Sequence, residues 1–302
     1  MISSGKTPTL YTTKLSSEQM DRVEAIACSR ALERYSVPYA RFAFRGDGFN
    51  IVGYESLKLV VQGKQAMSFV EFELEPYVLG QAVVGYDEVH HPEWFEEHAG
   101  MDESGKGDLF GPLVTACVVA GGDVVKQWMA DGIRDSKAIS SDHAIFVLEK
   151  KILSTAKATN VMCLRMEKYN ELYDRFGKNL NILLGWMHSR SLENALAKYP
   201  VPWGMLDQFS KQPITQRFLH QPSFQLKMQT KAEADPVVAA ASILARAEFS
   251  RQIEKLSKEA GFKIAKGAGK ATTEQAQRIL REQGHERLSH FIKMHFVNAP
   301  KL

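Results

Sequence analysis

Two adjacent acids, Asp102 and Glu103, stand directly before a glycine-rich stretch with a lysine, residues 104–112. A third acid, Asp207, ends the apolar run 202–206 much later in the chain. Acids at the carboxyl ends of strands that are far apart in sequence can converge on one cleft of an open sheet. Without a counter-ion they would raise each other's pKa values, and carboxylate oxygens are suitable ligands for Mg²⁺ or Mn²⁺. The pattern favours a metal site, with a capping or turn role for the first two acids as the alternative.

A sheet is needed to bring these acids together, and the second part of the chain has the alternating elements of an α/β domain. We expect strands ending near Met101 and at about 113–120, 160–165, 202–206 and 224–228. We expect helices at about 142–152, 181–196, 237–260 and 274–283. The alanine-rich start of the third helix would allow it to pack very closely against the sheet.

The first 80 residues predict a separate α+β unit. Ser16 and Gln19 have the spacing of a capping box, and apolar residues follow at helical spacing. The other expected elements are strands at about 10–13, 39–44, 49–54 and 57–61 and a helix from 65 to about 74. Residues 81–98 are acidic and lack periodicity, so we expect domains at 1–80 and 99–302 joined by this linker.

Composition narrows the class of protein. The chain has 302 residues and a net charge of +3, but residues 99–302 hold 29 basic and 21 acidic side chains. That excess suits a polyanionic substrate, although an ordinary solvated surface explains it equally well. No apolar run is long enough to cross a membrane. Cys28, Cys117 and Cys163 are far apart and in apolar surroundings, which predicts reduced cysteines in a cytoplasmic protein.

Several motifs in the same order resemble the type 2 ribonucleases H, the ribonuclease HII and HIII families. These motifs are the stretch 102–112, the triplet Asp135-Ser136-Lys137 and the helical run 239–246. An N-terminal extension of this length is similar to ribonuclease HIII in particular, and so are 231–233, 266–269 and 294–298. The resemblance covers the chain from about residue 99 onward and, more weakly, the first 80 residues.

The resemblance implies a ribonuclease-H-like catalytic domain, with a mixed sheet and flanking helices, after a small α+β domain similar to the TATA-binding protein. It implies an endonuclease that hydrolyses the RNA strand of RNA/DNA hybrids and leaves 5′-phosphate and 3′-hydroxyl ends. The cofactor would be Mg²⁺ or Mn²⁺, with two ions per site during turnover. By motif position the catalytic and metal-binding acids are Asp102, Glu103, Asp207 and Glu233. The loop after Glu233 is slightly shorter than is usual in the family, so Asp235 is a rival, although we prefer Glu233.

The same motifs imply residues that contact the hybrid duplex. Glycines in the loop would let backbone amides approach the minor groove, where the 2′-hydroxyl distinguishes RNA from DNA. The expected set is Ser104, Gly105, Lys106, Gly107, Lys137, Ser242 and Lys266. The alternatives are solvated surface lysines for Lys106 and Lys266, a structural ion pair for Lys137 and a helix cap for Ser242. Nothing in the sequence indicates an obligate dimer, so we expect a monomer.

Two other functions remain to be separated from this one. Resolvases and recombinases of the ribonuclease-H-like fold also use three or four acids, but none of their accessory motifs is found here. A nucleic-acid-binding protein without activity would not need the complete set of acids. A nucleotide-driven motor is not supported, because the Gly-x-x-x-x-Gly-Lys-Ser/Thr loop is absent from the sequence.

Overall fold

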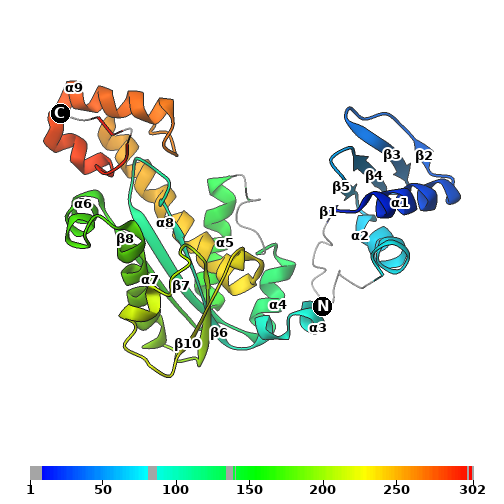
Figure 1. Cartoon of the computed structure of the whole chain (residues 1–302), viewed down its shortest axis with the longest axis horizontal. Helices are drawn as coiled ribbons and strands as arrows, with labels where there is room; N and C mark the ends of the chain where they lie inside the picture. The colour runs from blue at the N-terminus through cyan, green and yellow to red at the C-terminus, as the bar shows by residue number, and fades with distance from the viewer. Residues whose placement is uncertain (1–8, 81–86, 134–138, 140, 298, 301–302) are drawn as a thin grey trace. The chain divides into compact units, whose positions relative to one another are not determined.

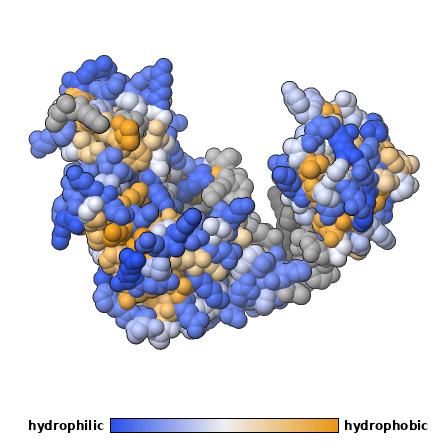
Figure 2. Space-filling model, viewed as in Figure 1, coloured by the Kyte–Doolittle hydropathy of each residue, from blue (hydrophilic) through white to orange (hydrophobic). Residues whose placement is uncertain are grey.

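The chain folds into two compact units that divide between Glu93 and Trp94, each with its own five-stranded sheet (Figure 1). The computed structural model describes residues 9–80, 87–133, 139, 141–297 and 299–300. Figure 2 shows hydrophilic residues over most of the visible surface of each unit, interrupted by smaller hydrophobic patches. Within the described ranges, no helix is both long and apolar enough to cross a membrane.

The smaller unit is an antiparallel sheet packed against helix α1 (Ser17–Ser29). Its spatial order is β1 (Leu10–Lys14), β5 (Lys58–Gln62), β4 (Phe49–Tyr54), β3 (Ala40–Gly46) and β2 (Glu33–Arg34). The expected capping box is confirmed: Gln19 N–H donates to Ser16 Oγ, and Ser16 N–H donates to Gln19 Oε1.

The second helical segment of the smaller unit is longer than expected. Helix α2 (Ala66–Phe69) continues as the π-helix η1 (Val70–Leu79) instead of ending near residue 74. Val70, Leu74 and Val78 are all buried against the rest of this unit. Their burial keeps the chain helical although Pro76 cannot donate a backbone hydrogen bond.

The larger unit contains a mixed sheet, as expected. Its spatial order is β10 (Gln225–Gln229), β9 (Trp203–Asp207), β6 (His98–Ser104), β7 (Leu113–Ala120) and β8 (Ala158–Leu164). The central strand β6 pairs parallel with β9 and antiparallel with β7. All of β7 is buried, because helices cover both faces of the sheet.

Helix α8 (Pro236–Ala260) covers one face of this sheet, and helix α7 (Leu180–Leu196) covers the other (Figure 1). Alternate residues of β7 point to the two faces, so Val118 packs on the α8 side and Val119 on the α7 side. A Cβ atom added at Gly100 of β6 would lie 2.3 Å from the backbone of α8. The expected close approach of this helix is therefore confirmed, and it depends on glycine as well as on the alanine run.

The remaining helices surround this core. In the larger unit they are α4 (Gly122–Ala130), α5 (Asp142–Thr155), α6 (Met166–Arg175) and α9 (Lys270–Phe291), with the short turns η4 (Thr215–Phe218) and η5 (Ala232–Ala234). Helix α3 (Asp87–His90) belongs to the first unit, and the turn η2 (Pro92–Phe95) spans the division between the units. The sequence interpretation did not include α4 or α6. Helix α9 consists of two helical pieces, because Gly284 adopts a non-helical conformation (φ 83°). The first piece therefore ends close to the expected residue 283, and the second piece, which was not expected, extends to Phe291.

Candidate active site

Three of the four expected acids lie at one edge of the larger sheet. Met101 of β6 and Leu206 of β9 are register partners in parallel strands, and each is followed directly by an acid. Asp102 and Asp207 are therefore neighbours, with Glu103 next along β6. The backbone N–H of Ala232 donates to Asp207 Oδ1 at 2.9 Å, which brings the turn η5 to the same edge. Glu233 is the middle residue of that turn.

The neighbouring carboxylates disturb one another. Burial raises the pKa of Asp102 to about 7, the charge of Glu103 adds to the effect, and Asp207 contributes further. Hydrogen bonds from Ser242 and from the Glu103 N–H partly oppose this rise. Such a shift means that the negative charge of Asp102 is costly in the absence of a cation. A bound divalent ion would relieve that cost.

Glu103 is held from two sides. His188 Nε2 lies 3.0 Å from Glu103 Oε2, and Lys106 Nζ lies 3.4 Å from Glu103 Oε1. Burial alone would raise the pKa of Glu103, but the His188 hydrogen bond and the nearby Lys106 outweigh burial and lower it. The ring of Phe209 stacks on His188, and Lys106 Nζ lies 5.3 Å from the centre of the same ring.

Asp235, the rival fourth acid, has a different environment. It is the N-cap of α8, where its Oδ1 accepts from Val237 N–H at 2.8 Å, and it is 2% exposed. Its Oδ2 lies 2.9 Å from Nε2 of the buried His98, whose Nδ1 lies 2.8 Å from the carbonyl of Glu96. The His98 ring is thus held between the Asp235 carboxylate and the Glu96 carbonyl. Asp235 is therefore engaged in a buried hydrogen bond with His98, whereas Glu233 is only partly buried.

The glycine-rich loop after Glu103 is tightly constrained. Gly105 has a φ of 87°, and a Cβ added there would lie 2.1 Å from the carbonyl oxygen of Pro112. Only glycine fits this position. At the other end of the loop, the fully buried Lys293 donates from Nζ to the carbonyls of Asp108 (2.8 Å) and Gly111 (2.6 Å). Burial lowers the pKa of Lys293 to about 7, and Asp108 opposes that change.

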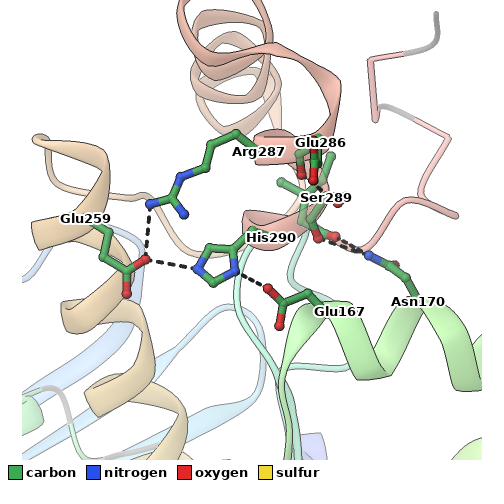
Figure 3. Close-up of polar contacts among 8 residues, drawn as sticks. Glu167, Asn170, Glu259, Glu286, Arg287, Ser289 and His290 are labelled. Carbon is green, nitrogen blue, oxygen red and sulfur yellow. Dashed lines mark hydrogen bonds and ion pairs between the residues drawn. The ribbon is translucent and has the colours of Figure 1, made fainter.

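Lys293 closely follows α9, whose end makes polar contacts with helices α6 and α8 (Figure 3). His290 Nδ1 lies 2.6 Å from Glu167 of α6, and its Nε2 lies 2.9 Å from Glu259 of α8. Asn170 Nδ2 donates to the carbonyls of Ser289 and Ile292, both at 3.1 Å. The segment that follows α9 is thereby fixed against the loop, where Phe110 and Ile292 form an antiparallel bridge.

Ser242 and Lys266, which were expected to contact the substrate, have protein partners outside the glycine loop. Ser242 lies inside α8, is 9% exposed and hydrogen-bonds to Asp102. Lys266 Nζ donates to both carboxylate oxygens of Asp142 at 3.2 Å and to Ser250 Oγ at 3.0 Å. A loose surface loop at 266–270 is therefore not observed, because tertiary contacts hold its first lysine.

The other expected contact residues lie in or near the glycine loop. Ser104 is the last residue of β6, and Lys106 is partly buried beside Glu103. Gly107 is exposed and has no atom within 4 Å of an added Cβ. Lys137 and its neighbour Asp135 lie outside the described residues.

The acids are suitable in chemistry for a divalent cation, but they do not form a ready-made cage. In the described part of the chain, no three His, Cys, Asp or Glu side chains are grouped closely enough to hold a metal ion. Glu103 is turned toward His188 and Lys106, so at least one of those contacts must give way to a cation. Carboxylate oxygens and the raised pKa of Asp102 both match such an ion. The residues that could hold it are Asp102, Glu103, Asp207 and Glu233.

Sequence reasoning missed His188 and Lys293. His188 lies on the buried face of α7, one turn after Leu184 and one turn before Leu192. A polar residue at an apolar position of an amphipathic helix is a signal that could have identified it. Lys293 has no comparable local signal, because its partners lie far away along the chain.

A family model described as ribonuclease HII matches residues 99–299. Among curated proteins, the ribonuclease HIII of Protochlamydia amoebophila is 37% identical over 260 residues, which is 85% of each chain. The ribonuclease HIII of Chlamydia abortus is 39% identical over 261 residues, which is 84% of each chain.

Solved structures agree with these sequence matches. The crystal structure of Bst-RNase HIII in complex with Mn²⁺ is 28% identical, with a TM-score of 0.65 over 96% of this chain and 97% of that one. Aquifex aeolicus RNase H3 is 25% identical, with a TM-score of 0.56 over 94% of this chain and 99% of that one.

Proposed function

The chain belongs to the type 2 ribonuclease H family, in its ribonuclease HIII branch, and on that premise we propose a catalytic centre at the ends of β6 and β9. The protein is an endonuclease that hydrolyses the RNA strand of RNA/DNA hybrids, and it has the family's ribonuclease-H-like fold. The observation that carries the proposed centre is the parallel pairing of Met101 with Leu206, which makes Asp102 and Asp207 neighbours.

Each acid has a defined part in the proposed centre. Asp102 and Asp207 are the central pair, Glu103 extends the site along β6, and Glu233 closes it from η5. When bound, Mg²⁺ or Mn²⁺ would neutralise the phosphate and lower the pKa of the attacking water. The acids supply the negative charge and the orientation, and the products would carry 5′-phosphate and 3′-hydroxyl ends.

The glycine loop is the proposed reader of the RNA strand. Gly105 and Gly107 leave the backbone open to a minor groove, where the 2′-hydroxyl is accessible. Ser104 and Lys106 lie beside the acids, and Lys106 would exchange its contact with Glu103 for a phosphate. Lys137, Ser242 and Lys266 complete the proposed set, with Ser242 acting through its hydrogen bond to Asp102.

Cleavage of defined labelled duplexes tests the proposed centre and its substrate. With Mg²⁺ or Mn²⁺, we expect the full chain to cut the RNA strand of an extended hybrid. We expect it to leave duplex DNA, duplex RNA and a duplex with a single ribonucleotide intact, and to lose all activity in EDTA. Equal cutting of duplex DNA, or full activity without a divalent ion, would contradict the proposal.

The smaller unit is proposed to be a substrate-binding domain, similar to the TATA-binding protein, at residues 1–80, with 81–98 as linker and 99–302 as catalytic domain. Its exposed Lys58 and Lys64 would contact phosphates, while Arg41 is paired with Asp21 and Arg45 with Glu33. We expect removal of residues 1–80 to raise the Michaelis constant for the hybrid at least tenfold and to change kcat far less. An unchanged Michaelis constant would exclude a binding role.

The protein is further proposed to act as a monomer in the cytoplasm. Its three cysteines are free, which suits a reducing compartment. A solution mass of twice the chain mass, or fractionation away from the cytoplasm, would contradict this part of the proposal.

A further inference from the structure

His188 is a fully buried histidine that sequence motifs do not assign to the site. Its side chain is 0% exposed, although it comes from the middle of α7 rather than from a strand end. Its Nε2 lies 3.0 Å from Oε2 of Glu103, whose own side chain is 12% exposed. A buried imidazole without a hydrogen-bond partner would cost free energy of folding. The contact with Glu103 offsets that cost, so folding favours this position of the His188 side chain.

A second polar contact fixes α7 at this height on the sheet. Thr115 of β7 is the register partner of Glu103 on β6, and its Oγ1 lies 2.8 Å from Oγ of Ser191. Ser191 is three residues after His188 and therefore lies on the same face of the helix. The Thr115–Ser191 contact is buried and the His188–Glu103 contact is partly buried, and α7 cannot slide along the sheet without breaking both.

The two ring nitrogens of His188 are not equivalent. Nδ1 of His188 is buried, and it has no hydrogen-bond partner among the residues that the structure describes. A proton on that atom would be a buried donor without an acceptor, at a cost of about 1–3 kcal/mol. Nε2, which faces Oε2 of Glu103, is the ring nitrogen that donates a hydrogen bond to this carboxylate.

We propose that His188 is a positioning residue that holds one oxygen of Glu103 so that the carboxylate can bind a divalent cation. The inference rests on the proposed function of Glu103 as a metal ligand. His188 fixes Oε2, while Oε1 is left with the longer, 3.4 Å contact to Lys106, which a cation can replace. Without His188, Glu103 is free to pair fully with Lys106, and that ion pair competes with the metal. Hydrogen-bonded partners of ligands typically contribute about 10- to 100-fold to metal affinity.

Calorimetric titration of the full chain with Mn²⁺, in the absence of nucleic acid, tests this role. We expect His188→Leu, which fills similar space without a donor, to weaken Mn²⁺ binding about 10- to 100-fold. We expect His188→Gln, whose amide nitrogen can take the place of Nε2, to bind within about threefold of the parent. Ser191→Ala is the matched control on the same helix face, and its Mn²⁺ affinity is expected to be unchanged.

Activity gives a second readout. For His188→Leu we expect the Mn²⁺ concentration for half-maximal cleavage to rise by the same factor, with kcat largely recovered at saturating Mn²⁺. A folded His188→Leu that binds Mn²⁺ like the parent overturns the proposal, and so does an equal loss in Ser191→Ala. If His188→Leu does not fold, His188→Asn, which is too short to reach Glu103, is compared with His188→Gln. Equal affinities of those two overturn the proposal, whereas weaker binding by His188→Asn supports it. A parent protein that binds no Mn²⁺ contradicts the proposed centre itself.

Discussion

Hydrolysis of an RNA/DNA hybrid is expected to fall on the order of a thousandfold or more in Asp102→Asn and in Asp207→Asn, while both variants stay folded and bind the hybrid. Asparagine keeps the shape of aspartate but removes the charge that a metal ion requires, and metal stabilisation of the transition state is worth several kcal/mol. Single-turnover cleavage and hybrid binding in EDTA measure the two properties separately. Either variant retaining a tenth of the parental rate would remove that acid from the catalytic centre.

Asp102→Asn is also expected to change how the stability of the protein depends on pH. Because the folded-state pKa of Asp102 is raised to about 7, the folded protein holds this proton where the unfolded chain has lost it. The parent therefore loses stability as the pH rises toward 7, and Asp102→Asn does not. In EDTA, we expect the variant to gain about 2 kcal/mol relative to the parent between about pH 5 and pH 8. Urea unfolding of both proteins at both pH values measures this difference. If the two free energies of unfolding change equally with pH, the pKa of Asp102 is not raised in the folded protein.

Glu233→Gln and Asp235→Asn are expected to have opposite effects. Glu233→Gln removes a proposed ligand from a partly buried turn, so turnover is expected to fall on the order of a hundredfold or more with little change in melting temperature. Asp235→Asn breaks the buried hydrogen bond with His98, so the free energy of unfolding is expected to fall by about 1–3 kcal/mol. Below its melting range, that variant is expected to keep its rate within about tenfold of the parent.

Kinetics and urea unfolding of both variants at one low temperature separate the two roles. Asp102→Asn serves as the reference for loss of a ligand without loss of stability. If Asp235→Asn is folded and inactive while Glu233→Gln is active, the fourth acid is Asp235 and not Glu233.

The sequence was informative where one local rule decides the structure. Acids that follow apolar runs predict a shared edge, because parallel strands end together, and the Met101–Leu206 pairing confirms this for Asp102 and Asp207. The alanine run of α8 likewise predicts close packing, because small side chains permit it. The alternation of predicted strands and helices in residues 99–302 likewise indicates a sheet with helices on both faces.

Residues whose environment depends on distant segments could not be placed in this way. Lys266 reads as a surface lysine in a glycine-rich loop, and only the fold brings it to Asp142. Ser242 reads as a helix cap, but α8 already begins at Pro236, so the serine lies inside the helix and against Asp102. His188 reads as one polar residue in an apolar helix until the sheet places Glu103 beside it.

Because Lys293 hydrogen-bonds to the glycine loop, the loop can reach its final conformation only after Lys293 has been synthesised. Lys293 is 185 residues after Asp108, whose carbonyl accepts its hydrogen bond. At about 5–20 residues per second, the loop leaves the ribosome about 10–40 s before the lysine that secures it is made. During that time the acids of β6 and their neighbouring loop exist without the segment that shapes them. A growing chain can therefore build its sheet early, yet it acquires a finished nuclease site only after Lys293 has been made.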